Sequence, residues 1–215
     1  MSDTLIVNEI FHSIQGESTY AGLPCVFVRL TGCKLRCTWC DTAYAFTEGV
    51  TMSLDAIISK VRTYACPLVE ITGGEPLLQP AVFSLLAHLC DLGFTVLLET
   101  SGSEDIAGVD ARVIRIMDIK CPSSGESDKN RYANLRRLTA QDELKFVLAD
   151  RNDYDWAKRL LTEHDLANRC AILFSPVWEK LPLKTLAEWI LADRLPVRLQ
   201  TQWHKHIWGP DARGV

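Results

Sequence analysis

The most informative stretch of the chain is Cys33-Lys34-Leu35-Arg36-Cys37-Thr38-Trp39-Cys40, in which three cysteines have the spacing C-x3-C-x2-C. Three thiolates on one short loop can hold three irons of a 4Fe–4S cube, whereas ferredoxin-type clusters take four cysteines. The spacing therefore predicts a cluster in which one iron has no protein ligand. A zinc site is the alternative, but zinc ribbons pair two C-x2-C units and this loop contains one. Zinc would also need two distant partners, such as Cys121 or a histidine.

A glycine-rich motif supports the cluster interpretation. Gly73-Gly74-Glu75-Pro76 begins 33 residues after Cys40 and follows a short apolar segment, residues 68–72. Alone, such a motif could be an ordinary turn. Its distance from the cysteine loop and its place at a strand end make it a much stronger signal.

The rest of the chain alternates strand-like and helix-like segments. We expect strands at residues 25–30, 68–72, 94–98, 113–119, 144–148, 171–174 and 197–200, and helices at 54–61, 82–89, 153–163 and 183–191. Ser53 is the expected N-cap of the first helix. This alternation implies a parallel sheet with right-handed crossovers. About six units are too few for an eight-fold barrel. The expected fold is α/β, a partial, open TIM-like β/α barrel with about six parallel strands, in one domain over residues 1–215.

The chemically distinctive residues fall where such a fold places its active site, at the carboxyl ends of strands. Those that follow predicted strands are Cys33, Gly73 to Pro76, Thr100 and Ser101, Asp118 and Lys120, and Ser175 and Pro176. This coincidence is stronger evidence for a site than any one motif.

Two groups of residues have no clear role in the sequence. The polar segment 121–139 is expected to be an exposed loop, either a flexible lid or a plain connection. The five cysteines outside the loop, at positions 25, 66, 90, 121 and 170, lie mostly in apolar settings. We expect them to be small buried hydrophobic residues.

Composition narrows the class of protein. Hydrophobic residues make up 47% and charged residues 23%, and the formal net charge is −4, which argues against a dedicated nucleic-acid binder. There is no run of 18 apolar residues, so no membrane-spanning helix is expected. The first residues lack the pattern of a signal peptide. These features predict a cytoplasmic protein without nucleic-acid or membrane partners.

With both motifs in place, the chain resembles the radical S-adenosylmethionine (SAM) superfamily. The resemblance implies a 4Fe–4S cluster on Cys33, Cys37 and Cys40. It also implies that the amino and carboxylate groups of SAM bind the open iron. Reductive cleavage of SAM then gives a 5′-deoxyadenosyl radical, and the protein orients and shields it.

The chain also resembles the 7-carboxy-7-deazaguanine synthase family, over nearly its full length. The stretches that match are residues 8–17, 27–33, 39–42, 71–76, 99–102 and 202–209. The resemblance implies a carbon–nitrogen lyase of queuosine-type 7-deazapurine biosynthesis. That family converts 6-carboxy-5,6,7,8-tetrahydropterin to 7-carboxy-7-deazaguanine and releases ammonia, with SAM regenerated and Mg²⁺ assisting.

The resemblance also implies site residues. Those expected to bind SAM are Trp39, Cys40, Gly74, Glu75, Ser101, Asp118, Ile119, Lys120, Ser175, Pro176, Val177 and Trp178. Those expected to bind substrate are Ile14, Gln15, Gly16, Glu17, Arg29, Thr72, Gln202 and His204, and Thr42 is the expected Mg²⁺ ligand. The family often has Ser-Pro-Lys where this chain has Asp118-Ile119-Lys120, so only the lysine matches well.

Several of these residues also suit the substrate's chemistry. A carboxylate calls for a cation such as Arg29. Glu17 can accept from the N–H donors of a guanidine-like edge. The plainer alternatives are a surface salt bridge for Arg29 and a turn for residues 15–17.

The two ends of the chain, residues 1–24 and 202–215, are expected to complete the substrate pocket. Trp203, Ile207 and Trp208 favour a docked tail, because a patch of exposed large apolar side chains is uncommon. The alternative is a frayed, solvated end.

Two other functions compete with this reading. A glycyl-radical activating enzyme would make the same radical but act on a partner protein. A non-enzymatic zinc or iron–sulfur module would not bind SAM. For the favoured function the expected partners are the pterin substrate, an electron donor such as flavodoxin or ferredoxin, and a second copy of the chain in a homodimer.

Overall fold

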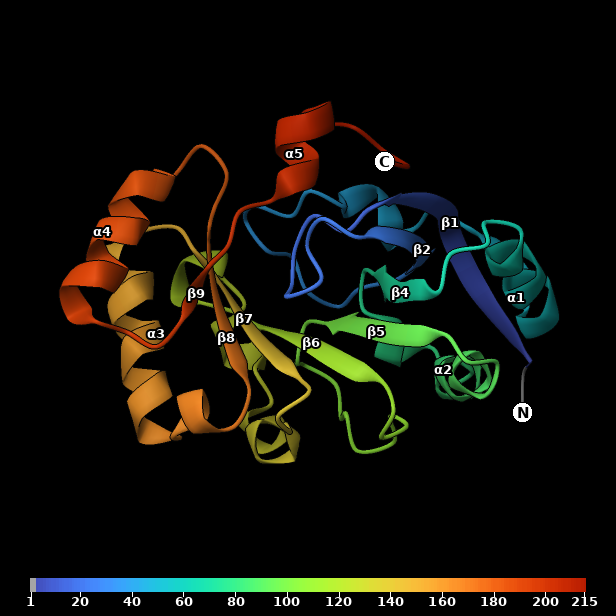
Figure 1. The fold of residues 1–215 in the computed structure, drawn as a ribbon, viewed down its shortest axis with the longest axis horizontal. Coiled ribbons are helices and arrows are strands. Elements are labelled where there is room, and N and C mark those ends of the chain that lie inside the picture. Colours follow the sequence, from blue (N-terminus) through green and yellow to red (C-terminus); the bar gives the residue numbers. More distant parts are fainter. Residues whose placement is uncertain (1–2) are drawn as a thin grey trace.

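The computed structural model describes residues 3–215 and contains one nine-stranded sheet with the order β3-β1-β2-β4-β5-β6-β7-β8-β9 (Figure 1). The strands are β1 (Thr4–Ile14), β2 (Pro24–Leu30), β3 (Val50–Ser53), β4 (Leu68–Gly73), β5 (Thr95–Thr100), β6 (Ile114–Ile119), β7 (Glu143–Leu148), β8 (Ala171–Pro176) and β9 (Arg198–Leu199). The helices are α1 (Leu54–Arg62), α2 (Val82–Asp91), α3 (Arg151–Glu163), α4 (Leu183–Asp193) and α5 (Trp203–Trp208).

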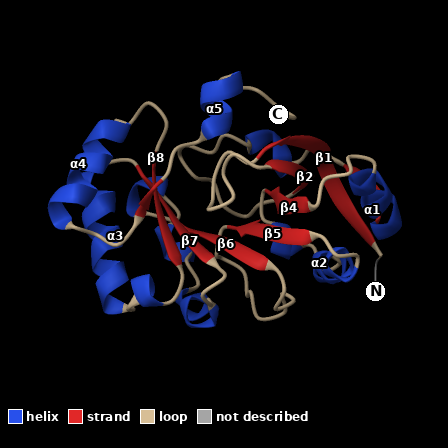
Figure 2. Ribbon diagram, in the orientation of Figure 1, coloured by secondary structure: helices blue, strands red, loops and turns tan. Residues whose placement is uncertain are grey.

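The parallel part of the sheet confirms the predicted fold class. From β2 through β4 to β9, each strand pairs in parallel with the next. In Figure 2, α3 and α4 lie beside β7 and β8, α1 and α2 lie toward β1 and β5, and α5 stands apart at the top. The sheet runs from β3 to β9 without the eight-fold repeat of a closed barrel, so the architecture is a partial, open β/α barrel.

The predicted helices and parallel strands are all present, within about two residues of the expected ends. Their apolar faces pack in the core, as in α1, where Leu54, Ile57 and Val61 are buried. Ser53 caps α1 as expected, because its hydroxyl accepts a hydrogen bond from the Ala56 amide at 3.2 Å.

Two antiparallel strands, β1 and β3, are present that were not expected from the sequence. β1 pairs antiparallel with both β2 and β3, so the sheet has more strands than the six or so expected. Because β1 runs against its neighbours, its last residue, Ile14, lies opposite Pro24 at the start of β2. The following loop therefore enters the barrel at the end where the parallel strands begin.

The expectation of an exposed loop at residues 121–139 is confirmed only in part: the segment connects β6 to β7 and about half of its residues are exposed, but others are ordered in the core. The segment contains three short 3-10 helices, η3 (Pro122–Ser124), η4 (Ser127–Lys129) and η5 (Tyr132–Arg137). Cys121, Ser124 and Asn134 are buried. Asn134 is held there because its amide donates to the carbonyls of Gly102 and Glu104.

The cysteines outside the loop behave largely as predicted. Positions 25, 66, 121 and 170 are buried, and Cys90 is half-buried. In the part of the chain that the structure describes, no helix has the length and apolar character needed to cross a bilayer.

Candidate active site

A cavity of about 320 Å³ lies inside the curve of the sheet. It extends from the carboxyl ends of the parallel strands, where the cysteine loop lies, to the loop that follows β1. Of the predicted site residues, those that line it are Ile14, Gln15, Gly16, Glu17, Arg29, Cys33, Cys37, Trp39, Cys40, Thr42, Thr72, Gly74, Ser101, Asp118, Lys120, Val177, Trp178, Gln202 and His204. Residues from both ends of the sequence therefore meet in one cavity.

The three cysteines of the loop form the wall of the cavity at the carboxyl ends of the parallel strands. Cys33, Cys37 and Cys40 are half-buried, free of disulfides and part of the cavity lining. Cys33 follows β2 because Gly32, with a φ of 102°, turns the chain at the strand end. Arg36 stiffens the loop, since its guanidinium lies 4.2 Å from the Phe46 ring centroid and donates to the Cys33 carbonyl at 2.8 Å.

Segment 122–126, which the sequence analysis assigned to an exposed loop, holds the cysteine loop. The Thr38 amide donates to the Ser124 carbonyl at 3.1 Å, and the Arg36 amide donates to a Glu126 carboxylate oxygen at 2.7 Å. The Thr38 hydroxyl also donates to the Ser123 carbonyl at 3.0 Å. Segment 122–126 therefore acts as a clamp on the outer side of the cysteine loop.

The two glycines of the second motif are needed for close backbone contact. A Cβ on Gly74 would lie 2.2 Å from the Gly32 carbonyl oxygen, and one on Gly73 would lie 2.2 Å from that of Leu30. The Gly74 amide donates to the Leu30 carbonyl at 3.1 Å. The motif thus continues β4 directly against the start of the cysteine loop.

Glu75 joins two strand ends. Its buried carboxylate accepts from the Ser101 amide at 2.7 Å and the Leu77 amide at 3.0 Å, and from the hydroxyls of Thr100 and Ser101. Burial raises the pKa of Glu75, and these hydrogen bonds oppose the shift. The side chain therefore shapes the loop and does not face the cavity.

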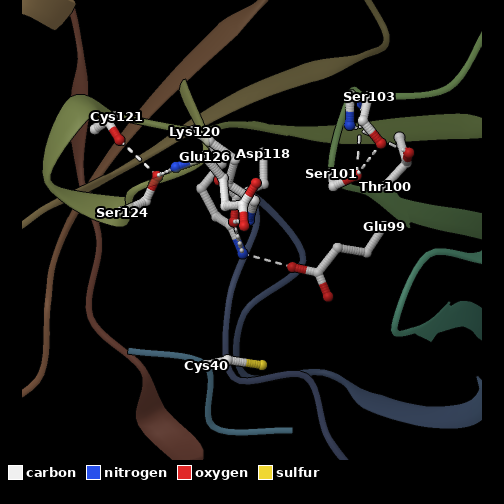
Figure 3. Close-up of polar contacts among 12 residues, drawn as sticks. Cys40, Glu99, Thr100, Ser101, Ser103, Asp118, Lys120, Cys121, Ser124 and Glu126 are labelled. Atoms are coloured by element: carbon white, nitrogen blue, oxygen red, sulfur yellow. Dashed lines mark hydrogen bonds and ion pairs between the residues drawn. The ribbon is translucent and has the colours of Figure 1, made fainter. Parts of the chain in front are cut away.

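Two buried polar atoms that border the cavity, one on Asp118 in β6 and one on Trp178 after β8, have no protein partner in the described chain. Asp118 Oδ2 lies 3.0 Å from the Lys120 ammonium, but Asp118 Oδ1 is buried without a hydrogen bond, and so is Trp178 Nε1. Figure 3 shows Glu99, Asp118 and Lys120 converging, with Cys40 across the open space from them. Buried polar atoms normally find partners, so these two are available to a ligand.

The residues present fit a 4Fe–4S cluster and SAM. Three free thiols on one loop can bind three irons, and the glycines bring backbone close to the adjoining space. The unpartnered acceptor of Asp118 and donor of Trp178 suit a polar ligand beside the cluster. Four predicted SAM residues do not line the cavity, and these are Glu75, Ile119, Ser175 and Pro176.

A buried lysine, Lys145, pairs with several carboxylates in the half of the cavity that lies near the loop after β1. It was not among the residues predicted from the sequence. The Lys145 ammonium lies 2.9 Å from Glu17, 2.5 Å from Glu99 and 3.6 Å from Asp118. Burial alone raises the pKa of Glu99, but Lys145 and the Thr72 hydroxyl outweigh it and hold that pKa at about 2. Glu99 is therefore charged at neutral pH.

The polar loop after β1 forms the floor of the cavity. Glu17 accepts from Gln202 at 2.8 Å and from Gln200 at 3.0 Å, besides its ion pair with Lys145. Gly16 packs so tightly that a Cβ there would lie 2.4 Å from the His204 ring, and its carbonyl accepts from the Trp203 amide at 3.1 Å. This loop is a built structure and more than a surface turn.

Arg29 both forms a salt bridge and lines the cavity, so the two roles considered for it, a salt bridge and substrate binding, are compatible. Its Nε donates to Glu9 at 2.8 Å, and Tyr44 donates to the same carboxylate at 2.9 Å. Arg29 also lines the cavity. Across residues 3–215, no hydrogen bond reaches its two terminal nitrogens, so both remain available to a ligand.

The predicted metal residue lies at the cavity edge. Thr42 lines the cavity, and its hydroxyl is 3.8 Å from the Cys40 sulfur. Neighbouring Asp41 forms an ion pair with Lys205 at 2.7 Å. Lys205 lowers the pKa of Asp41 against the raising effect of burial.

The tail is docked, but by polar residues. Trp203, Ile207 and Trp208 are 51%, 53% and 39% exposed, so the expectation that they bury the tail is wrong. The contacts come from buried Lys205 and from Arg213, whose guanidinium lies 3.8 Å from the Tyr44 ring centroid.

Comparison with known proteins agrees with this geometry. Residues 27–119 match the family described as the radical SAM superfamily. The structure is similar to the crystal structure of QueE from Escherichia coli, with a TM-score of 0.77 and 24% identity over 93% of this chain and 94% of that one. The fold and the three-cysteine site together define a radical SAM protein.

Curated relatives extend the similarity to the whole chain. The 7-carboxy-7-deazaguanine synthase of Chlorobaculum tepidum is 50% identical, over 98% of this chain and 97% of the relative. Its namesake in Koribacter versatilis is 46% identical over 97% and 99%, and that of Thermoplasma acidophilum is 37% identical over 98% and 100%. The chain belongs to the 7-carboxy-7-deazaguanine synthase family.

Proposed function

We propose that this chain converts 6-carboxy-5,6,7,8-tetrahydropterin to 7-carboxy-7-deazaguanine with release of ammonia, as a carbon–nitrogen lyase of 7-deazapurine biosynthesis. One observation carries the proposal: a single cavity has three free cysteines on one wall and a set of charged and polar side chains on its floor. A glycyl-radical activating enzyme would instead need an open groove for a protein, and a simple metal module would need no such floor.

The half of the cavity beside the cysteine loop suits the cofactors. When bound, the cluster and SAM supply a 5′-deoxyadenosyl radical. Cys33, Cys37 and Cys40 would hold the cluster, and Gly74, Ser101, Asp118, Lys120 and Trp178 would border SAM. The glycine backbone gives close approach, and the unpartnered atoms of Asp118 and Trp178 provide an acceptor and a donor.

The half of the cavity near the loop after β1 suits the pterin. The free terminal nitrogens of Arg29 would bind the substrate carboxylate. Glu17, held by Lys145, would accept from ring N–H groups, with Gln15, Thr72 and His204 around the ring. Burial lowers the pKa of His204, which favours its neutral form. These groups would fix the ring so that one C–H faces the SAM site.

Thr42 would be the protein ligand of Mg²⁺. Mg²⁺ usually takes one or two protein oxygens and completes its octahedral shell with substrate and water. The ion pair with Lys205 occupies one oxygen of the Asp41 carboxylate and makes it a loop-shaping residue. A cation at Thr42 would also help neutralise the substrate carboxylate.

We propose one radical SAM domain over residues 1–215, in which residues 1–24 and 202–215 complete the substrate pocket. The contacts of Gly16 with Trp203 and of Glu17 with Gln202 support this arrangement. A closed pocket protects a radical from solvent. The protein would act in the cytoplasm as a homodimer and take electrons from a donor such as flavodoxin or ferredoxin.

Anaerobic reconstitution tests the function. The chain is loaded with iron and sulfide and supplied with SAM, dithionite, Mg²⁺ and the tetrahydropterin. Formation of 7-carboxy-7-deazaguanine and ammonia, with SAM recovered, is the expected result. Cleavage of SAM without a pterin product would instead favour a protein substrate, and absence of SAM binding would favour a simple metal module.

A further inference from the structure

One acidic side chain of the cavity differs from the others in its surroundings. The acidic side chains that line the cavity are Glu17, Asp41, Glu70, Glu99 and Asp118. Four of them lie within 3.0 Å of a lysine ammonium. No ion pair of residues 3–215 reaches the fifth, Glu70.

Glu70 is fixed by an amide instead. It is the third residue of β4 and is 4% exposed. Its Oε2 accepts from Gln15 Nε2 at 2.5 Å. The orientation of the Gln15 amide is set because its Oε1 accepts from the Glu17 backbone amide at 3.1 Å. The other oxygen of Glu70, Oε1, has no hydrogen bond in the described chain.

These surroundings favour a protonated Glu70. The groups that face Glu70 come from four elements: Gln15 and Glu17 from the loop after β1, Cys25 from β2, Glu99 from β5 and Lys145 from β7. Arg29 also lies on β2, opposite Thr72, two residues beyond Glu70 in the sheet. The lysine already pairs with the carboxylates of Glu17, Glu99 and Asp118, and Arg29 pairs with Glu9. A buried carboxyl group without a cation takes up a proton, because the charged form is costly to desolvate. Burial and then the charge of Glu99 raise the pKa of Glu70 well above its usual range.

We propose that Glu70 is a recognition residue for the pterin ring and binds it as a neutral carboxylic acid. This inference rests on the proposed function. A protonated Oε1 can donate to a ring carbonyl or ring nitrogen, whereas a carboxylate can only accept. Phe27 lies beside Glu70 in the register of β2 and β4. Its ring stacks on Phe11 with centroids 5.0 Å apart, and both line the cavity as a flat aromatic surface for the ring.

The dissociation constant of the tetrahydropterin tests the proposal. It is measured anaerobically by equilibrium dialysis, with cluster-loaded protein, SAM and Mg²⁺ but no reductant, so that no turnover occurs. Glu70→Leu removes the donor, and we expect binding about tenfold weaker. Glu70→Gln keeps a donor of the same shape, and binding should stay within about threefold. Glu188→Gln, on the exposed face of α4, is the matched control.

The pH dependence separates a neutral acid from a charged one. As pH rises through the raised pKa of Glu70, the wild type loses its donor and gains a negative charge, so its binding should weaken. Glu70→Gln donates at every pH, so the ratio of its affinity to that of the wild type should rise as the pH is raised through the pKa of the wild-type Glu70. Iron content and SAM affinity, measured on each variant, show whether the site has folded.

Three results would overturn the proposal: wild-type affinity in Glu70→Leu, equal losses in the Leu and Gln variants, or a ratio of wild-type to Gln affinity that does not change with pH. If Glu70→Leu fails to hold iron, the pH comparison with Glu70→Gln decides. If the wild type itself does not bind the tetrahydropterin, the proposed function is wrong and this inference falls with it. If the wild type binds and only the variants disagree, the function stands and Glu70 has another role.

Discussion

The Lys145 ammonium lies 2.5 Å from the Glu99 carboxylate, although the two residues belong to strands separated by β6. The same ammonium lies 2.9 Å from Glu17, which is 128 residues away in the chain. One buried cation therefore ties the loop after β1 to the middle of the sheet. Both carboxylates depend on it, because no other lysine or arginine of residues 3–215 pairs with either.

We predict that Lys145→Met destabilises the protein and the substrate site together. Removing one partner of a buried ion pair costs about 3–5 kcal/mol, because the other charge stays buried. For a chain of this size the thermal midpoint should fall by roughly 10 °C. Anaerobic circular dichroism of the cluster-loaded protein measures it. Lys158→Met, which removes an exposed partner of Asp193, is the control and should shift the midpoint by only about 2 °C. Equal shifts in the two variants would contradict the central role of Lys145.

The cluster should need three cysteines only. Alanine at Cys33, Cys37 or Cys40 should abolish the brown iron–sulfur chromophore and activity. Alanine at Cys25, Cys66, Cys90 or Cys170 should leave both, since none of these lines the cavity. Absorbance and iron content after reconstitution measure the effect. An empty cluster site in Cys121→Ala, with the fold intact, would mean that the iron left open by the loop has a protein ligand after all.

We predict that Glu126 slows the loss of iron from the cluster on the cysteine loop. Its carboxylate accepts from the Arg36 amide inside the cysteine loop, so Glu126→Ala should loosen that loop. We expect iron release to a chelator to become about tenfold faster, from the loss of a charge-assisted hydrogen bond. Asp128→Ala is the control, because Asp128 lies on the same segment and pairs with exposed Lys129. Identical release rates for the two variants would show that the clamp does not matter for the cluster.

Thr42→Ala should lower activity and its stimulation by Mg²⁺. Cluster content and substrate-free cleavage of SAM should stay intact, because only the proposed metal ligand is removed. Activity measured against Mg²⁺ concentration tests this prediction. Full stimulation in Thr42→Ala, with loss of stimulation in Asp41→Ala, would assign the metal to Asp41.

Elements with a strong local pattern could be predicted from the sequence. The i, i+3, i+4, i+7 spacing from Leu54 to Val61 gave α1 and its cap, and the apolar run before Cys33 gave β2. β1 was missed because polar residues such as Asn8 and His12 interrupt its apolar pattern, and pairing on both sides stabilises it regardless. Local preference does not record such pairing.

The residues of the site also fall into those that could be predicted from the sequence and those that could not. Residues in short motifs, such as Cys33 and Gly74, could be recognised because their chemistry depends on neighbours in the sequence. Lys145 could not, because its partners Glu17 and Glu99 lie in distant segments of the sequence and its own neighbours in β7 are mostly buried. A charged residue in a buried strand was the available signal. The exposed Trp203 and Trp208 show the converse error, in which apolar character alone suggested burial.

The contact between Gly16 and Trp203 has a consequence for synthesis of the protein. The floor of the cavity is made by two loops that lie far apart in the sequence, so the strands between them can pair before the second loop has been synthesised. The cysteine loop emerges early, so a nascent chain presents it beside an unfinished pocket. If iron and sulfur were loaded before residue 204 has emerged, oxygen could reach the cluster through the unfinished floor of the cavity. We therefore expect the cluster to be loaded after residue 204 has emerged and the floor has closed.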